Sequence, residues 1–159
     1  MRTMVLGIGS PIMSDDAVGL KVVEMVRSLG LEGVEVHDHS TSGLDIIEIV
    51  LDFDRVIVVD AILTGMVPPG EFQILTTEDF KHAVTPGTPH EINMFTAIEI
   101  GRRVHPGRMP SDIVLVAVEV ADVVTVSEEM TPEVKAAIPS IVDKVRELID
   151  STGHQKSSS

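Results

Sequence analysis

Two aspartates and one histidine occupy positions from which an α/β fold could direct them to a single site. Asp16 follows a short apolar run, Asp60 directly follows four β-branched residues, and His90 begins an amphipathic segment. Carboxylate and neutral imidazole groups bind divalent metals such as zinc, nickel, manganese and iron, and the spacing does not choose among them. A metal held in this way polarises a carbonyl and lowers the pKa of bound water, so this set allows metal-assisted hydrolysis.

Asp60 ends a run, residues 56–59, whose uninterrupted β-branched character is typical of a strand buried on both faces. A carboxylate at the end of such a strand is poorly solvated, so it needs a metal, an ion-pair partner or a set of hydrogen bonds. The alternative to a ligand role is that Asp60 accepts hydrogen bonds from nearby loop amides. The sequence favours neither interpretation.

His90 lies in the sequence Thr88-Pro89-His90-Glu91, which fits a capping box with Thr88 as the cap and Pro89 at the first helical position. This pattern places His90 in the first turn of a helix. The positive end of the helix disfavours the imidazolium ion and keeps the ring in the neutral form that binds metals. The alternative is a histidine that faces solvent.

Asp16 belongs to the sequence Ser14-Asp15-Asp16, which is also typical of an ordinary helix start. In that interpretation Ser14 is the cap and the two acids lie in the first turn, where they are stabilised by the helix dipole. We therefore expect one of the two aspartates to have this structural role only.

Asp38 ends the predicted second strand and permits a different interpretation of the N-terminal region. Gly7 and Gly9 follow a first strand, as in a dinucleotide-binding fold, and Asp38 would then bind the ribose. Ile12 occupies the position of the third glycine, however, and the carboxylates after it would repel a pyrophosphate. A Rossmann-like nucleotide-binding oxidoreductase is therefore kept as the alternative function. Without a bound nucleotide, Gly7 and Gly9 are explained by a tight turn that needs their backbone freedom.

The remaining histidines carry weaker signals. His37 and His39 flank Asp38, and strand alternation directs both to the side opposite Asp38, where we expect a surface location. The others are expected in loops or at the surface: His82, His105 and His154.

Short apolar runs alternate with longer amphipathic segments, which predicts a single α/β domain with a twisted, mostly parallel five-stranded sheet and helices on both faces. Ligands bind at the carboxyl ends of the strands in such sheets, and the acids and His90 converge there. The domain covers residues 1–150, and we expect the polar tail 151–159 to be disordered. Strands are expected at 4–8, 34–37, 56–59, 71–75 and 113–118, and helices at 16–29, 44–51, 91–104 and 132–149, with Pro139 a candidate kink.

The composition narrows the classes of partner. The chain has 159 residues with 12 Lys+Arg against 25 Asp+Glu, a net charge of -13 that argues against nucleic acid and anionic membranes as partners. The absence of Cys excludes disulfides, thiolate metal sites and cysteine nucleophiles. No apolar stretch approaches the roughly 18 residues of a membrane helix, and no signal peptide is visible, so we expect a cytoplasmic protein.

Four segments in order resemble the hydrogenase maturation proteases. They are residues 5–10 (VLGIGS) with 15–19 (DDAVG), Asp38 with 40–43 (STSG), residues 58–61 (VVDA), and His90. The first block is fairly specific in combination, whereas the others are informative through their order and spacing. The resemblance spans nearly the whole chain.

The resemblance implies an endopeptidase that removes a short C-terminal extension from the large-subunit precursor of a [NiFe] hydrogenase once nickel is in place. It implies that Asp16, Asp60 and His90 bind the metal and that Asp38 is a further acid near the cleft, which orients a ligand or assists proton transfer. The metal would be the nickel of the precursor, with zinc or another divalent ion able to bind in vitro. A monomeric protein is expected.

Three departures from the family pattern concern this region: Ser10 where Asn is common, Asp16 where Glu is frequent, and a different sequence after His90. None of them removes a ligand, because Asp16 is one methylene shorter but keeps its charge. The loops 40–43, and 64–70 with 85–89, are expected to hold the precursor. A module that senses the metal and binds the precursor without cutting it is the third candidate function.

Overall fold

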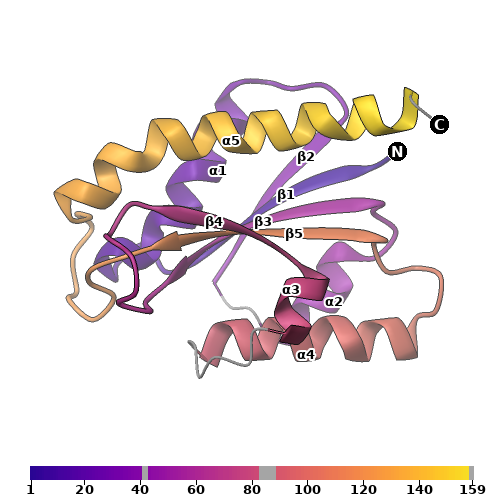
Figure 1. Ribbon diagram of the computed structural model, residues 1–159, viewed down its shortest axis with the longest axis horizontal. Helices are drawn as coiled ribbons and strands as arrows, with labels where there is room; N and C mark the ends of the chain where they lie inside the picture. Colours follow the sequence, from indigo (N-terminus) through magenta and orange to yellow (C-terminus); the bar gives the residue numbers. More distant parts are fainter. Residues whose placement is uncertain (41–42, 83–88, 158–159) are drawn as a thin grey trace.

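The computed structural model describes residues 1–40, 43–82 and 89–157, and for 80–82, 89–93, 95 and 152–157 it describes the backbone only (Figure 1). A central sheet has the strand order β2-β1-β3-β5-β4. The strands are β1 (Thr3–Ile8), β2 (Val34–His39), β3 (Arg55–Ile62), β4 (Phe72–Thr76) and β5 (Asp112–Glu119). All neighbours are parallel except β4, which pairs antiparallel with β5. The expected mostly parallel five-stranded sheet is confirmed.

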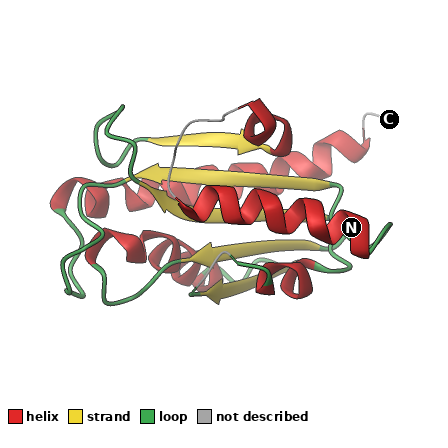
Figure 2. Cartoon of the chain, turned by 90° about the horizontal axis from the view of Figure 1, so that it is seen from below, coloured by secondary structure: helices red, strands yellow, loops and turns green. Residues whose placement is uncertain are grey.

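Helices cover both faces of the sheet (Figures 1 and 2). One face packs against α1 (Val18–Ser28) and α5 (Pro132–Ser157), and the core there is rich in valine. The other face packs against α2 (Asp45–Val50) and α4 (Pro89–Val104). Every residue of β1 and β3 is buried, as their continuous apolar sequences predict for strands covered on both faces.

The close fit of α1 to the sheet depends on a glycine. A Cβ atom at Gly19 would lie 2.4 Å from the carbonyl oxygen of Val59 and 2.7 Å from that of Ile8. Because no side chain occupies this position, the first turn of α1 rests directly on the ends of β1 and β3. The segment before α1 is therefore held against the carboxyl edge of the sheet.

The start of α1 differs from the sequence-based expectation. The predicted helix 16–29 is a 3₁₀ turn, η1 (Ser14–Ala17), followed by α1. Ser14 has a φ of 50° and its hydroxyl donates to the carbonyl of Glu129, so the expected role of Ser14 as a helix cap is wrong. The long-range contact competes successfully with local capping.

Two further elements differ at the ends of the predicted segments. A short helix, α3 (Thr77–His82), follows β4 and was not among the predicted elements. The last helix runs through Ser157, so residues 151–157 of the expected disordered tail belong to α5. No helix among the described residues combines the length and apolar character needed to cross a bilayer.

Candidate active site

The carboxyl edge of the sheet contains a point where the strand order reverses. From β1 the chain passes through α1 to β2 at the edge, and then returns past β1 to β3. Open α/β sheets bind ligands in the crevice outside such a reversal, because the flanking connections diverge there. β1 and β3 border this reversal, and Asp16 lies in η1 after β1 while Asp60 lies near the end of β3.

Asp16 is half-buried, and a backbone contact fixes its carboxylate. The backbone N–H of Ser10 donates to Oδ2 of Asp16 at 2.9 Å. Gly9 has a φ of 155°, and a Cβ atom there would lie 2.0 Å from the carbonyl oxygen of Asp16. The sequence Gly9-Ser10 therefore closes tightly over η1, and the glycine is needed for this approach rather than for a bound phosphate.

Asp60 is buried, with only 3% of its surface exposed. Alternation along β3 places it on the same face as Val56 and Val58, which belong to the core under α2 and α4. The N–H of Ala61 donates to Oδ1 of Asp60 at 2.8 Å. The expectation of a poorly solvated carboxylate is confirmed, and its contact with a backbone amide is compatible with both interpretations of this residue.

His90 is the second residue of α4. Figure 1 shows that α4 begins on the side of the molecule to which the carboxyl ends of β1, β3 and β5 point. The side chain of His90 and the proposed cap Thr88 lie outside the described parts of the chain. Among the side chains that are described, no three His, Asp or Glu groups form a cluster that could hold a metal ion. The three-residue ligand set thus stays a prediction.

Asp38 lies on the other face of the sheet from Asp60. It is in register with Gly7, and Val34 and Val36 of the same strand face pack into the core under α1 and α5. Its side chain is 58% exposed and pairs with Arg27 of α1 at 3.5 Å. The prediction that Asp38 and Asp60 lie at the same edge of the sheet is confirmed. Strand alternation, however, directs their side chains to opposite faces of the sheet.

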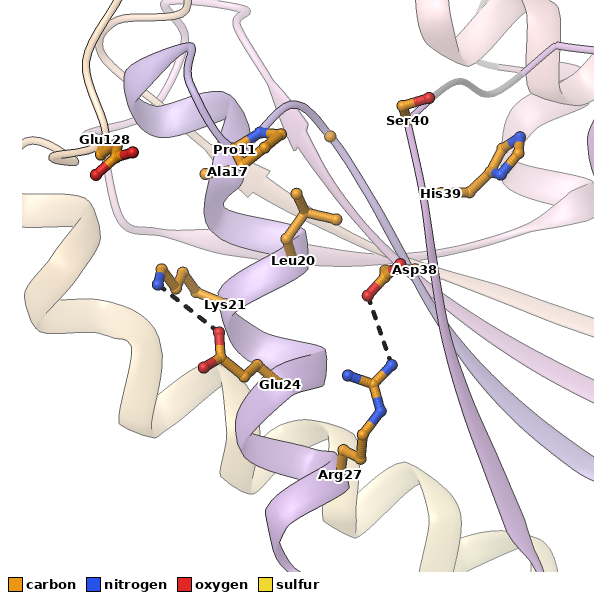
Figure 3. Close-up of a pocket in the computed structure, with 11 residues that line it drawn as sticks. Pro11, Ala17, Leu20, Lys21, Glu24, Arg27, Asp38, His39, Ser40 and Glu128 are labelled. Carbon is orange, nitrogen blue, oxygen red and sulfur yellow. Dashed lines mark ion pairs between the residues drawn. The ribbon is translucent and has the colours of Figure 1, made fainter.

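Asp38 instead lines a cleft of about 750 Å³ between α1 and the end of β2 (Figure 3). Leu20 and Arg27 form the α1 side of this cleft, and His39 and Ser40 form the β2 side together with Asp38. The cleft reaches Gly9, the residue that closes over Asp16. It therefore adjoins the candidate site without containing Asp16 or Asp60.

The histidines of β2 have acidic partners. His37 is 48% exposed and lies 3.7 Å from Glu35, which confirms its surface location. His39 is less exposed and lies 3.7 Å from Asp45 at the start of α2.

Asp15 has a structural role, but through long-range contacts rather than at the helix start, where the sequence predicted such a role for one of the two aspartates. It is fully buried, and it accepts hydrogen bonds from the N–H groups of Ala121, Asp122 and Thr131 and from the Thr131 hydroxyl. It thereby ties η1 to the loop between β5 and α5. Local sequence could not reveal this role, because the partners lie more than a hundred positions away.

Glu119 is a second buried acid that the sequence analysis missed. It ends β5, is 1% exposed, and accepts hydrogen bonds from the N–H groups of Thr64 and Gly65 and from the Thr64 hydroxyl. The sequence could have revealed Glu119 as a buried acid, because it follows a buried apolar run just as Asp60 does. Asp15 and Glu119 both hold loops at the carboxyl edge of the sheet.

This geometry defines an α/β protein with two carboxylates at a topological reversal and loops fixed around them. The family model for hydrogenase maturation proteases (HycI) matches residues 20–148. The chain belongs to the hydrogenase maturation protease family.

Individual relatives agree with this assignment. The chain is 28% identical to the hydrogenase 2 maturation protease of Escherichia coli K12, over 96% of its own length and 93% of that protein. Its fold matches that of the hydrogenase maturating endopeptidase HybD from E. coli with a TM-score of 0.80 at 25% identity, covering 96% and 94% of the two chains. HybD from Thermococcus kodakarensis has the same fold, with a TM-score of 0.78 at 21% identity, covering 93% and 99%.

Proposed function

We propose that this protein removes the C-terminal extension of a [NiFe] hydrogenase large-subunit precursor after nickel insertion. The observation that carries the proposal is that Asp16, in the turn after β1, and Asp60, near the end of β3, lie at the strand-order reversal in a chain of this protease family. In this proposal Asp16, Asp60 and His90 bind the nickel that the precursor brings. The protein acts as a cytoplasmic monomer.

The donor set suits such a metal, because carboxylate and imidazole ligands bind nickel and zinc. Nickel held near the scissile bond would polarise its carbonyl. The residues of the chain orient the ligand carboxylates. Burial holds the Asp60 carboxylate in place, and the N–H of Ser10 fixes that of Asp16. Ligands held in advance lose little entropy when the precursor arrives.

The nucleotide-binding alternative receives no support from the glycines on which it rested. A Cβ atom at Gly7 would lie 2.5 Å from the carbonyl oxygen of Gly19, so Gly7 allows α1 to approach β1. Gly9 has the same role toward Asp16. Both glycines are thus accounted for by backbone packing.

The experiment is mass spectrometry of a nickel-loaded large-subunit precursor incubated with the protein. We expect the parent protein to release one defined C-terminal peptide, and Asp16→Asn, Asp60→Asn and His90→Ala to release none. Asp143→Asn, an exposed acid of α5, is the matched control and should cleave as the parent does.

Two results would contradict the proposal. Cleavage by the His90→Ala variant would remove His90 from the site. A parent protein that binds the precursor without cutting it would instead support the metal-sensing module.

A further inference from the structure

The most exposed large apolar side chains of the described residues gather in loops at one edge of the sheet. Val124 is 78% exposed, Met66 77% and Val126 75%. Ile12 and Leu63, on loops at the same edge, are also exposed. We call these residues the apolar crown: Ile12, Leu63, Met66, Val124 and Val126.

The three loops of the crown follow β1, β3 and β5, so all of them lie at the carboxyl edge (Figures 1 and 2). Backbone hydrogen bonds join two of these loops and the ends of β3 and β5. The N–H of Ser127 donates to the carbonyl of Ile12 at 2.8 Å, and the N–H of Val120 donates to that of Ile62 at 3.0 Å. The crown therefore borders the same edge as Asp16 and Asp60.

Buried carboxylates hold two of these loops in place. Asp15 anchors the loop that carries Val124 and Val126, and Glu119 anchors the loop that carries Met66. Burying an ionised carboxylate is costly unless hydrogen bonds compensate it. In this protein, hydrogen bonds compensate the burial of Asp15 and Glu119, and the same bonds hold two loops whose exposed tips are apolar. The hydrophobic core does not need these exposed side chains for its stability.

Asp122 stiffens the tip of the loop between β5 and α5. The hydroxyl and N–H of Thr125 and the N–H of Val124 donate to its carboxylate, and these contacts hold the pKa of Asp122 below its usual range. A loop that is fixed before binding loses less conformational entropy on association. Exposed apolar groups on fixed loops are typical of a protein-binding surface.

The charges of the crown loops indicate the chemistry of the partner. Residues 9–13, 63–71 and 120–131 contain no Lys or Arg, and their charged residues are all acidic: Glu71, Asp122, Glu128 and Glu129. A complementary surface would have an apolar centre bordered by Lys and Arg side chains.

We propose that the apolar crown docks the folded body of the large-subunit precursor, through an apolar patch on the precursor that is bordered by basic residues. This inference rests on the proposed function, because the crown lies at the same edge of the sheet as the carboxylates to which the precursor must deliver its scissile peptide. Docking of the folded body is thus separate from binding of the cleaved segment, and it determines how tightly the precursor binds.

The test compares a crown variant with a matched control. The crown variant combines Met66→Gln, Val124→Ser and Val126→Ser, which remove apolar surface without adding charge. The control combines Val104→Ser and Leu29→Gln, which are exposed apolar residues at the ends of α4 and α1. Both variants should unfold at the temperature of the parent protein, because all five side chains are exposed.

Two measurements keep this inference apart from the proposed function. The first is the Kd of the nickel-loaded precursor for each protein in an Asp16→Asn background, which requires no cleavage. The second is the KM and kcat of cleavage. We expect the crown variant to raise Kd and KM at least tenfold while kcat stays within twofold, and the control to match the parent.

An unchanged Kd in the crown variant overturns the inference, and so does a fall in kcat without a rise in KM. A parent protein that does not cut the precursor overturns the proposed function instead, while the Kd comparison still tests the crown.

Discussion

At the scale of single residues, Asp15 and Asp16 are neighbours with opposite surroundings. Asp15 is fully buried and accepts hydrogen bonds from several donors of the loop before α5, whereas Asp16 is half-buried and accepts one from the N–H of Ser10. A carboxylate that accepts several N–H donors is a structural anchor, and its oxygens have little capacity left for a ligand. If Asp16 binds the metal as proposed, the two adjacent positions divide stability and function between them.

This separation predicts different effects for matched substitutions. Asp15→Asn turns an amide NH₂ toward backbone N–H donors in either orientation, so we expect a loss of about 3 kcal/mol in the free energy of unfolding. Asp16→Asn should unfold within about 0.5 kcal/mol of the parent and lose cleavage. Urea unfolding and precursor processing measure the two effects. Equal stability of both variants would contradict the anchor role of Asp15.

A second prediction at this scale concerns pH. The pKa of Asp122 is lowered from 3.8 by the Thr125 hydroxyl and by the N–H groups of Thr125 and Val124. The stabilisation of the loop is therefore fully present above pH 3.8 and is lost as the pH falls through the lower pKa of the folded state. In NMR spectra the amide shifts of Val124 and Thr125 should titrate below pH 3.8 and should not do so in Asp122→Asn. A midpoint at or above that pH would contradict the hydrogen-bond assignment.

At the scale of elements, the fit of α1 against β1 and β3 positions Asp16. Gly19→Ala places a Cβ atom 2.4 Å from a backbone carbonyl oxygen, which only a shift of the helix can relieve. We expect a loss of about 3 kcal/mol in unfolding free energy together with reduced cleavage, because η1 moves with α1.

Gly101→Ala in α4 is the matched control. Its new Cβ atom would meet the end of the Met109 side chain at 2.8 Å, and that flexible side chain can move. The helix propensity of alanine then offsets the cost, so the stability should change by less than about 1 kcal/mol. Thermal unfolding of the two variants tests the contrast, and an equal loss in both would show that the Gly19 contact is not special.

The elements that sequence patterns predict well are those defined by local chemistry. The β-branched run before Asp60 and the apolar run before Glu119 identified buried strands. The position of Asp16 and Asp60 after the ends of predicted strands placed both at the carboxyl edge of the sheet. The side of the sheet that Asp38 faces was not predicted, because it depends on the register with β1. The 3₁₀ start of η1 was also missed, since the conformation of Ser14 is set by contacts with residues beyond position 120.

At the scale of the whole molecule, the net charge of -13 acts over longer distances than any single contact. An acidic protein and a basic-bordered docking patch attract each other before contact, and salt screens that attraction. We expect kcat/KM for the precursor to fall roughly tenfold between low and high salt, with kcat changing little. Steady-state kinetics at several sodium chloride concentrations provide the measurement. A kcat/KM that does not depend on salt would contradict the basic border of the docking patch and would leave only its apolar contacts.

The link from Asp15 to Ala121 and Thr131 also has a consequence for synthesis of the protein. Those partners leave the ribosome long after Asp15 does, so a nascent chain that ends before them has no anchor for the segment that carries Asp16. The candidate site is completed only when the chain up to α5 has been made. A partly synthesised protease therefore lacks the assembled site, and a truncated translation product would not compete with the finished protein for precursor.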